Sequence, residues 1–428
     1  MGVAGLAGNN NGRPFRGPVA GTLRHSPSKL GNPTPATPGT TPARRGDRQA
    51  FRPRSSGTAI CLDDTASRRL SAGATFTVND SDQPVVPLHH APSGAAGGGM
   101  PVACRIQTGS RLHFGLLSVN NPDVPSFGGV GLMLDDPRAI VEVRRSDSPS
   151  IDAPPALLPR IRDWLSRLAA MDEPVARASL HVRVSVEIPP HAGFGSGTQT
   201  GLALAEAVRR VCGLPFTSPW EVARGIGRAR RSAIGVAGYL QGGLIVDAGH
   251  RPGEPVGEII ARSCLPEDWR VVLVESPRTE GLSGTAEGTA FDRLPPLPRE
   301  TTDRLCGLIV LELLPALSTG DCRRFVCGLV EYGRCVGEYF AREQGGTFAS
   351  PAIARCHAAL QAAGWPGLAQ SSWGPTSATL VPDEDQAGRL AEIVLRAGGM
   401  DEVRVRVVSP RNEGRSMREF YPGDEHPE

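Results

Sequence analysis

Apolar and polar residues follow two different rhythms along most of the chain. Residues 140–145 and 180–188 alternate with a period of two, which predicts half-buried strands. Residues 155–170 and 199–212 carry apolar side chains at helical spacing, which predicts helices. Before about residue 100 neither rhythm is present. The sequence therefore predicts one long ordered part that mixes strands and helices.

Further elements are expected up to residue 408. A helix is expected at residues 220–231, and strands at 243–248 and 269–275 are expected to belong to one sheet. The remaining predicted elements are helices at 305–317, 323–344 and 351–363, strands at 368–372 and 377–381, a helix at 385–397 and a strand at 403–408. This succession predicts an α+β fold.

The first 99 residues differ from the rest in composition. They are rich in Gly, Pro, Ser, Thr, Ala and Arg, and residues 26–45 read SPSKLGNPTPATPGTTPARR. Such a sequence cannot bury enough apolar surface to offset the entropy lost on ordering, so we expect a disordered, low-complexity tail at 1–99. Near residue 295 the mixture of predicted strands and helices gives way to three successive helical stretches, which predicts two domains, at 100–295 and 296–412. Residues 413–428 are expected to be a flexible C-terminus.

Charge, hydropathy and cysteine content narrow the range of partners. The 46 Lys and Arg and 44 Asp and Glu give a formal net charge of +2. The overall charge of the chain is therefore too small to favour binding to a nucleic acid. A nucleic-acid-binding arm or a transit peptide in the Arg-rich tail is a less favoured alternative. No apolar run reaches the roughly 18 residues that span a bilayer, and the first 20 residues lack the apolar centre of a secretory signal. We expect a cytoplasmic protein without membrane contact, whose nine cysteines are ordinary buried thiols.

The most informative stretch is a glycine-rich turn between a predicted strand and a predicted helix. Residues 188–208 read IPPHAGFGSGTQTGLALAEAV, with three glycines in the five residues 193–197. Such a turn directs unpaired backbone N–H groups and the positive end of a helix dipole at one place, which favours an anion site. The hydroxyls of Ser196, Thr198 and Thr200 add donors. A turn without a ligand is the alternative; a Walker A loop is excluded by the missing Gly-Lys-Ser/Thr ending.

This turn resembles the phosphate-binding motif of the GHMP kinase superfamily, which reads Pro, three variable residues and Gly-Leu-Gly-Ser-Ser. The stretch departs from the motif only in having Phe194 for Leu and Gly197 for the second serine. The resemblance implies a ribosomal-protein-type β-α-β N-terminal domain and a ferredoxin-like C-terminal domain. It also implies a phosphate site made by Gly193, Phe194, Gly195, Ser196, Gly197, Thr198 and Gln199.

Five motifs in the same order resemble one branch of that superfamily, the β-ribofuranosylaminobenzene 5′-phosphate synthases. They are TGSRLHFGL at 108–116, FGGVGL at 127–132, GFGSGTQ at 193–199, RSAIG at 231–235 and GGLIVDAG at 242–249. The resemblance covers residues 102–410. It implies condensation of phosphoribosyl pyrophosphate with 4-hydroxybenzoate or 4-aminobenzoate, with loss of carbon dioxide and pyrophosphate, in tetrahydromethanopterin biosynthesis.

One position separates this reaction from a kinase reaction. GHMP kinases typically carry a Ser-Gly-Val-Asp stretch before a Gly-Gly pair, and its Asp helps to activate the substrate hydroxyl. The corresponding stretch here ends in Gly235, so a kinase would lack its usual base. An ATP-dependent small-molecule kinase and a non-catalytic, metabolite-binding homodimer remain alternatives. A homodimer is expected in either case, with the apolar residues 305–317 as a candidate subunit contact.

The implied chemistry needs groups that neutralise phosphates, hold a carboxylate and exclude water. Backbone N–H groups, Arg side chains and Mg²⁺ supply these functions, and no organic cofactor is expected. Arg111 and His113, two apart on an expected strand, face the same side and are candidate catalytic residues. Glu280 and Glu287 lie in an expected Gly-rich loop, where a carboxylate could bind Mg²⁺ or orient the ring. The alternatives are a structural histidine and a mobile surface loop.

Basic and aromatic residues complete the candidate site. Arg228, Arg230 and Arg231 crowd the expected end of the helix at 220–231, and Arg231 is the selected phosphate ligand. A solvated basic helix face is the alternative.

Residues 370–378 join two expected strands and resemble the superfamily's third, glycine-bearing motif. Ser372, Trp373 and Gly374 are therefore candidate contacts of the substrate ring, with Trp373 stacking on it. The alternative is a tight hairpin that buries a Trp.

Overall fold

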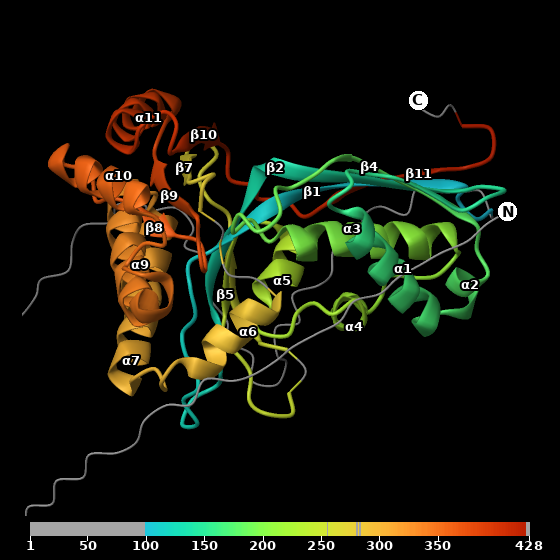
Figure 1. The fold of residues 1–428 in the computed structure, drawn as a ribbon, viewed down its shortest axis with the longest axis horizontal. Helices are drawn as coiled ribbons and strands as arrows, with labels where there is room; N and C mark the ends of the chain where they lie inside the picture. Colours follow the sequence, from blue (N-terminus) through green and yellow to red (C-terminus); the bar gives the residue numbers. More distant parts are fainter. Residues whose placement is uncertain (1–98, 255, 280, 282–283, 425–428) are drawn as a thin grey trace, which may run out of the picture. The chain divides into compact units, whose positions relative to one another are not determined.

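The computed structural model describes residues 99–254, 256–279, 281 and 284–424. Nearly all of the predicted tail and the candidate Glu280 lie outside the described residues. Within the described part, the alternation of strands and helices confirms the predicted mixed fold, which is built on two sheets (Figure 1).

The first sheet is built around two long neighbouring strands, β1 (Ala103–His113) and β2 (Gly129–Arg145). Its other strands are β3 (Ser150–Asp152), β4 (Leu180–Val186), β5 (Leu244–Asp247), β6 (Ile259–Ser263) and β11 (Ser416–Phe420). The order is β11-β1-β2-β4-β3, and β5 pairs with the start of β2 and with β6. All pairs are antiparallel except β3 with β4.

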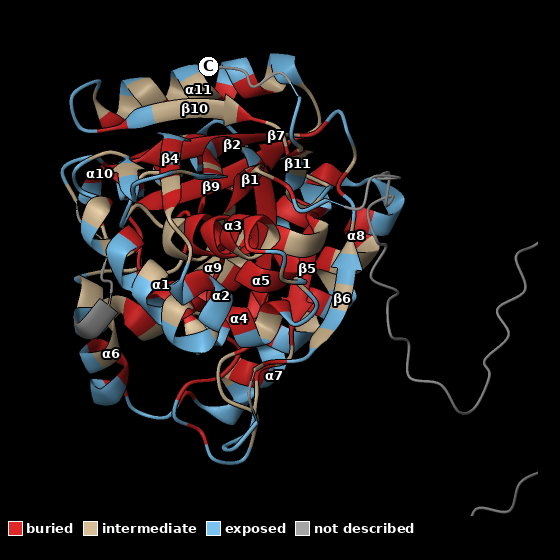
Figure 2. Cartoon of the chain, turned by 90° about the vertical axis from the view of Figure 1, so that its right-hand side faces the viewer, coloured by how far each residue is buried: buried red, intermediate tan, exposed pale blue. Residues whose placement is uncertain are grey.

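A layer of helices covers one face of this sheet, as Figure 1 shows. They are α1 (Leu158–Met171), α2 (Glu173–Ala176), α3 (Ser196–Val211), α4 (Pro219–Gly225) and α5 (Ile234–Gln241). The central helix α3 is buried along almost its whole length (Figure 2). Its small residues permit close packing, since a Cβ at Gly201 would lie 3.3 Å from the ring of Trp164.

The second sheet has an apolar core on each face. Its strands are β7 (Arg270–Glu275), β8 (Ala369–Gln370), β9 (Thr376–Val381) and β10 (Arg404–Val408), in the order β10-β7-β9-β8. Alternate residues of β7 enter different cores: Val271 and Leu273 pack with α9 (Cys322–Gln344), whereas Val272 and Val274 pack with α10 (Pro351–Ala362) and α11 (Glu384–Gly398). The remaining helices are α6 (Gly284–Arg293), α7 (Arg299–Gly307), η1 (Leu308–Leu313) and α8 (Leu314–Thr319).

Several expectations from the sequence are wrong in detail. β5 and β7 lie in different sheets. Residues 416–420 of the expected flexible C-terminus form β11, which pairs with β1 and buries Phe420. The division into two domains near residue 295 stays a prediction. All described residues belong to one compact unit, and the chain passes from the first sheet to the second between β6 and β7.

Two helical expectations also change. The helix expected at 220–231 ends at Gly225 because Gly227 turns the chain with a positive φ of 77°. The Gly-rich loop expected around Glu287 becomes helix α6 from Gly284 onward.

Five of the eight described cysteines are buried as expected, whereas Cys264, Cys306 and Cys327 are exposed. In the part of the chain that is described, no helix is both long and apolar enough to cross a membrane.

Candidate active site

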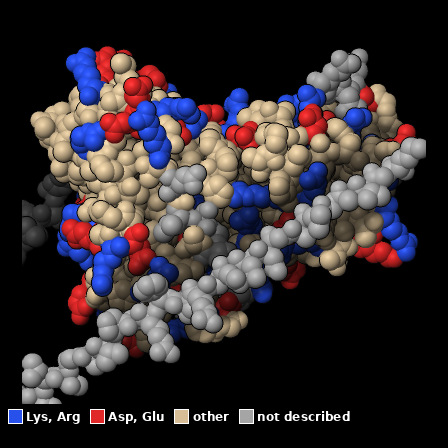
Figure 3. Space-filling model, in the orientation of Figure 1, with Lys and Arg blue, Asp and Glu red and all other residues tan. Residues whose placement is uncertain are grey.

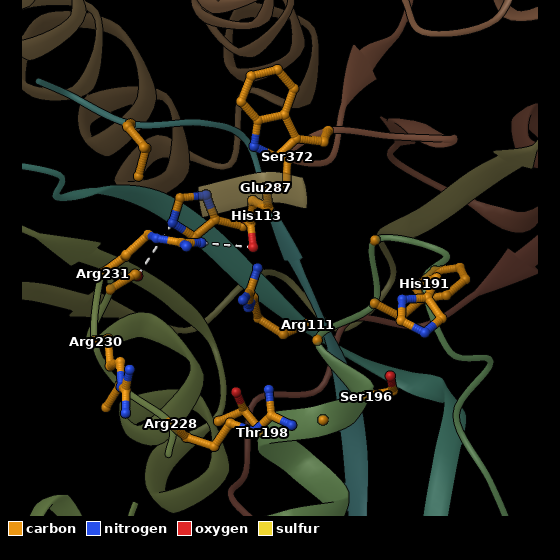
Figure 4. Close-up of a pocket in the computed structure, with 18 of the residues that line it drawn as sticks. Arg111, His113, His191, Ser196, Thr198, Arg228, Arg230, Arg231, Glu287 and Ser372 are labelled. Carbon is orange, nitrogen blue, oxygen red and sulfur yellow. Dashed lines mark hydrogen bonds and ion pairs between the residues drawn. The ribbon is translucent and has the colours of Figure 1, made fainter. Parts of the chain in front are cut away.

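A cavity of about 680 Å³ opens where the glycine turn, the end of β1, residues 227–232, α6 and residues 372–374 meet. Figure 4 shows Ser196, Thr198 and Arg228 on one side of it and His113, Arg231 and Glu287 on the other, with Arg111 between them. The cavity therefore joins the predicted phosphate loop to the predicted ring contacts.

The glycine turn is shaped to receive an anion. Gly195, with a left-handed φ of 67°, is the N-cap residue of α3 and has no side chain to cap the helix start. Backbone N–H groups of a first turn that lacks such a cap, together with the helix dipole, attract negative charge. A Cβ at Gly195 would lie 3.2 Å from Arg111 Nε, and one at Gly197 would lie 2.8 Å from Arg228 Cζ. Both glycines thus allow a guanidinium to lie directly against the loop.

Positive charge dominates the cavity wall. The arginines that line it are Arg111, Arg160, Arg228, Arg230 and Arg231, and Glu287 is the one acidic side chain among the described lining residues. The sequence has a single lysine, Lys29, so every basic side chain coloured in Figure 3 is an arginine, and several gather around the recess in the middle of that face. Guanidinium groups suit phosphate and carboxylate because they bind in a bidentate way.

Two of these arginines, Arg111 and Arg228, are buried and have lowered pKa values. Burial lowers the pKa of Arg111 to about 10, against the opposing charge of Glu287. Burial also lowers the pKa of Arg228, with Arg160 as the next cause. The Nε atoms of Arg111 and Arg228 are buried without a hydrogen-bond partner among the described residues. A buried donor on a cation is costly to leave unpaired, so an anionic ligand would stabilise both side chains.

His113 is held as a neutral ring. Gly115 N–H donates to its Nδ1 at 3.2 Å, which assigns the ring proton to Nε2, and Nε2 lies 3.2 Å from Ser232 Oγ. Burial and the nearby Arg111 lower the pKa of His113 to about 3. At neutral pH the ring can donate one hydrogen bond from Nε2 but does not act as a cation.

Aromatic rings form another part of the cavity wall. Phe340 of α9 stacks on Trp373 with ring centroids 4.2 Å apart, and Phe291 of α6 meets Trp373 edge-on at 5.4 Å. The Arg231 guanidinium lies 4.9 Å from the centre of the Phe291 ring and pairs with Glu287 at 2.6 Å. Trp373 Nε1 is buried without a partner among the described residues. These rings give the cavity an aromatic wall.

Comparison with known proteins gives the same assignment as the motifs. A model of the GHMP kinases N-terminal domain matches residues 164–243. The β-ribofuranosylphenol 5′-phosphate synthase of Methanothermobacter thermautotrophicus is 31% identical over 341 residues, which cover 74% of this chain and 99% of the relative. The chain belongs to this synthase family. The synthase of Archaeoglobus fulgidus is 32% identical over 52% of this chain and 72% of its own length.

Solved structures confirm the GHMP-kinase-like fold. Homoserine kinase from Cytophaga hutchinsonii superposes with a TM-score of 0.53 at 16% identity, over 76% of this chain and 100% of the kinase chain. Mevalonate-3-kinase from Thermoplasma acidophilum gives a TM-score of 0.53 at 12% identity, over 74% and 99%. At these identities the likeness concerns the fold alone. Membership of the synthase family confirms the prediction that the chain is an enzyme, a transferase.

Most of the candidate residues from the sequence meet at the cavity. The lining includes the selected Arg111, His113, Glu287, Arg231, Gly193, Phe194, Gly195, Ser196, Gly197, Thr198, Ser372, Trp373 and Gly374. The Phe194 side chain itself is buried in the core. Gln199 is absent from this lining: its Oε1 accepts from Thr108 Oγ1 and its Nε2 donates to Gly235 O, both at 2.8 Å. Gln199 therefore ties α3 to β1 and α5, which corrects its assignment as a phosphate ligand.

Three residues in or next to the cavity were not found from the sequence: Ser371, which is buried behind its wall, and Arg160 and His191, which line it. Ser371 Oγ accepts from His113 N–H at 3.1 Å and donates to Gly193 O at 2.8 Å, so it joins β1, the glycine turn and the β8–β9 loop. Arg160 of α1 and His191 also line the cavity, with 2.9 Å between Arg160 Nη2 and His191 Nε2. Arg160 has no local signal, since it is a polar residue of an ordinary amphipathic helix. Ser371 lies within the 370–378 segment and could have been selected with Ser372.

Proposed function

We propose that the chain condenses phosphoribosyl pyrophosphate with 4-hydroxybenzoate or 4-aminobenzoate, releasing pyrophosphate and carbon dioxide, in tetrahydromethanopterin biosynthesis. One observation carries this proposal: a single cavity combines a glycine turn flanked by guanidinium groups with a cluster of aromatic rings. Those are the surfaces that a polyphosphorylated sugar and a flat benzoate need at the same time. The names of the archaeal relatives support the same reaction.

The phosphate groups fit the side of the glycine turn. Arg228 lies against Gly197, and Arg160 and Arg230 complete a wall of fixed positive charge. As the bond between ribose C1 and pyrophosphate breaks, negative charge grows on the leaving oxygens, and these donors stabilise it. The positive charge that develops on the ribose is spread over C1 and the ring oxygen.

The benzoate fits between Arg111 and the aromatic cluster. The ring lies against Trp373, which itself stacks on Phe340, and the unpaired Arg111 Nε is a donor for its carboxylate. The ring carbon that bears the carboxylate then attacks ribose C1. Departure of carbon dioxide returns the electron pair of the broken C–C bond to the ring and restores aromaticity.

Mg²⁺ remains part of the proposal, although the described residues fit a protein-held ion poorly. They contain no group of three His, Cys, Asp or Glu side chains that could hold a metal, and Glu287 is paired with Arg231. Mg²⁺ commonly binds through substrate phosphates and water. We propose that it enters with the pyrophosphate of the substrate, and that no organic cofactor takes part.

The kinase alternative is disfavoured by the surroundings of Gly235. A Cβ at this position of α5 would lie 3.0 Å from Thr198 Cγ2, so a carboxylate side chain would crowd the side chain of Thr198 in the first turn of α3. The same glycine that removes the usual kinase base thus fits the packing of the phosphate loop.

Labelled carbon dioxide tests the proposal directly. The protein is incubated with carboxyl-labelled 4-hydroxybenzoate, with and without phosphoribosyl pyrophosphate. We expect release of label that depends on phosphoribosyl pyrophosphate and that yields one pyrophosphate per carbon dioxide. ATP turnover with a sugar or polyol acceptor, without release of label, would instead establish the kinase. Well-folded protein that does neither would favour the non-catalytic binding protein.

We also propose a homodimer and a cytoplasmic location. Val310 and Leu311 of η1 are 58% and 64% exposed, which supports the apolar stretch at 305–317 as the subunit contact. Sedimentation of wild type and of Val310→Asp tests this, since the charged variant is expected to be monomeric.

A further inference from the structure

A fully buried carboxylate, that of Asp247, lies behind the part of the cavity wall that Ser232 forms. Asp247, the last residue of β5, is fully buried, and it accepts backbone N–H groups from Ala233 at 2.6 Å and from Gly249 at 2.8 Å. The side chain of Ser232, next to Ala233 in the chain, lowers the pKa of Asp247 by hydrogen bonding and so lies close to the carboxylate. Because a carboxylate only accepts, the Ser232 hydroxyl is the donor. Ser232 itself lines the cavity, so its hydroxyl connects Asp247 with the substrate space.

The surroundings of Asp247 differ from those of the equally buried Glu206. Glu206 pairs with the Arg415 guanidinium at 2.7 Å and accepts from Tyr239 Oη at 2.7 Å. Among the described residues, Asp247 has no ion pair with an arginine. Burial raises its pKa, and the hydrogen bonds from Gly249, Ala233 and Ser232 oppose this shift. Asp247 is therefore a better proton acceptor than an exposed carboxylate.

Few titratable groups face Asp247. His250, three residues further along the chain, and Tyr332 of α9 interact with it electrostatically, and His113 reaches it through Ser232. The neighbouring strands contribute uncharged partners, Gly129 of β2 and Ile259 of β6. Among these groups, Ser232 is the one that lies between Asp247 and the cavity.

The Ser232 hydroxyl is placed to exchange partners when a substrate binds. Its Oγ accepts from His113 Nε2–H and from Ile234 N–H, and both contacts measure 3.2 Å, the long end of the N–H···O range. A substrate hydroxyl that replaces His113 at Ser232 Oγ donates to Ser232 and in turn accepts from His113 Nε2–H. His113 stays neutral, so it stabilises charge on the substrate oxygen without protonating it.

We propose that Ser232 and Asp247 form a proton relay for the 4-hydroxyl group of the benzoate. This inference rests on the proposed function. As the ring attacks ribose C1 and pyrophosphate leaves with the bonding pair, the phenolic proton passes to Ser232 Oγ while the Ser232 proton passes to Asp247. The phenolic oxygen becomes a carbonyl oxygen. When the C–COO⁻ bond breaks, its electron pair restores the ring, the oxygen regains its lone pair, and the proton returns along the same path.

The relay has different consequences for the two benzoates. A phenol that donates electrons without losing its proton leaves a strongly acidic oxonium group, so a proton acceptor lowers the barrier. An aniline nitrogen donates its lone pair more readily and forms a stable iminium group without losing a proton first. The relay therefore accelerates the reaction of 4-hydroxybenzoate and has little effect on that of 4-aminobenzoate.

The test compares kcat for both benzoates at saturating phosphoribosyl pyrophosphate in wild type, Asp247→Asn, Ser232→Ala and the control Glu206→Gln. We expect Asp247→Asn and Ser232→Ala to lower kcat with 4-hydroxybenzoate by about 10²-fold, the usual size of general acid–base effects. With 4-aminobenzoate both variants should stay within about fivefold of wild type. Wild type should show an acid limb in kcat with 4-hydroxybenzoate that Asp247→Asn lacks.

Equal losses with both benzoates, or no loss with either, would overturn the relay. Glu206→Gln removes a carboxylate of the same burial and reports the cost of destabilisation, which should be the same for both substrates. If Asp247→Asn does not fold, Ser232→Ala decides, because it leaves the buried carboxylate and its backbone partners in place. A wild-type enzyme that releases carbon dioxide from neither benzoate would refute the proposed function itself.

Discussion

Gly197 is the residue at which the phosphate loop departs from the serine of the superfamily motif, and Arg228 accounts for that departure. A Cβ at Gly197 would lie 2.8 Å from Arg228 Cζ, so a side chain there would push the guanidinium away from the loop. The glycine and the arginine therefore belong together: a hydroxyl donor is replaced by a charged donor. Sequence analysis found both the glycine and Arg228, but it could not predict their contact, because 31 positions separate them.

We predict that Gly197→Ser raises the KM for phosphoribosyl pyrophosphate about tenfold, which corresponds to about 1.4 kcal/mol of lost binding. Because the displaced group is the end of a flexible side chain, the free energy of unfolding should hardly change. Steady-state kinetics and urea unfolding measure the two effects. Gly388→Ser is the matched control, since Gly388 is an exposed helical glycine with open space around its Cβ position. An unchanged KM in Gly197→Ser would show that Arg228 does not bind the substrate.

The buried, neutral His113 predicts how stability depends on pH. Its pKa falls from 6.5 to about 3 in the folded protein, so the unfolded chain binds a proton that the folded chain does not. The stabilisation is therefore complete above pH 6.5 and is lost as the pH falls towards 3, by about 1.4 kcal/mol for each pH unit. Urea unfolding at pH 7.5 and pH 5 should show a smaller loss in His113→Gln than in wild type. The partly exposed His181→Gln should behave as wild type, and equal losses in all three proteins would contradict the assignment.

At the scale of elements, local pattern predicted the position of most helices and strands but not their partners. The helix after the glycine turn was predicted because its small residues and its glycine start are both local signals, and α3 begins at Ser196. The end of α4 at Gly225 was missed because the apolar spacing continues beyond it, whereas Gly227 turns the backbone. The sheet membership of β7 and β11 depends on contacts between residues far apart in sequence, which no local pattern records.

β11 gives a prediction at this scale. Residues 413–428 were expected to be flexible, yet Arg415 neutralises the buried Glu206 and Phe420 is 1% exposed. Removing residues 413–428 should lower the free energy of unfolding by about 3 kcal/mol, because it removes the closer of the two arginines that pair with the buried Glu206 and leaves only Arg210, at 3.7 Å. Removing only 422–428 retains β11 and should change little. Thermal or urea unfolding distinguishes the two truncations, and equal stability of both would show that β11 contributes nothing.

For the whole molecule, the two sheets contribute different parts of one cavity. Strand β1 of the first sheet brings Arg111 and His113 to its end, and the β8–β9 loop of the second sheet brings Ser372 and Trp373. Ser371 joins the two through its hydrogen bonds to His113 and Gly193. The motifs predicted most of the lining because each is a short local sequence. Their meeting at one place, and the exclusion of Gln199 from it, depend on the packing of both sheets.

The central claim is that the glycine turn and Arg228 hold the pyrophosphate while the aromatic cluster holds the benzoate ring. A crystal structure with phosphoribosyl pyrophosphate and unsubstituted benzoate, which lacks the electron-donating group needed for attack, tests this most directly. We predict pyrophosphate oxygens within hydrogen-bond distance of the backbone of residues 195–198 and of Arg228, and the benzoate ring against Trp373. Phosphoryl groups bound away from residues 193–198, or a benzoate outside the aromatic cluster, would contradict it.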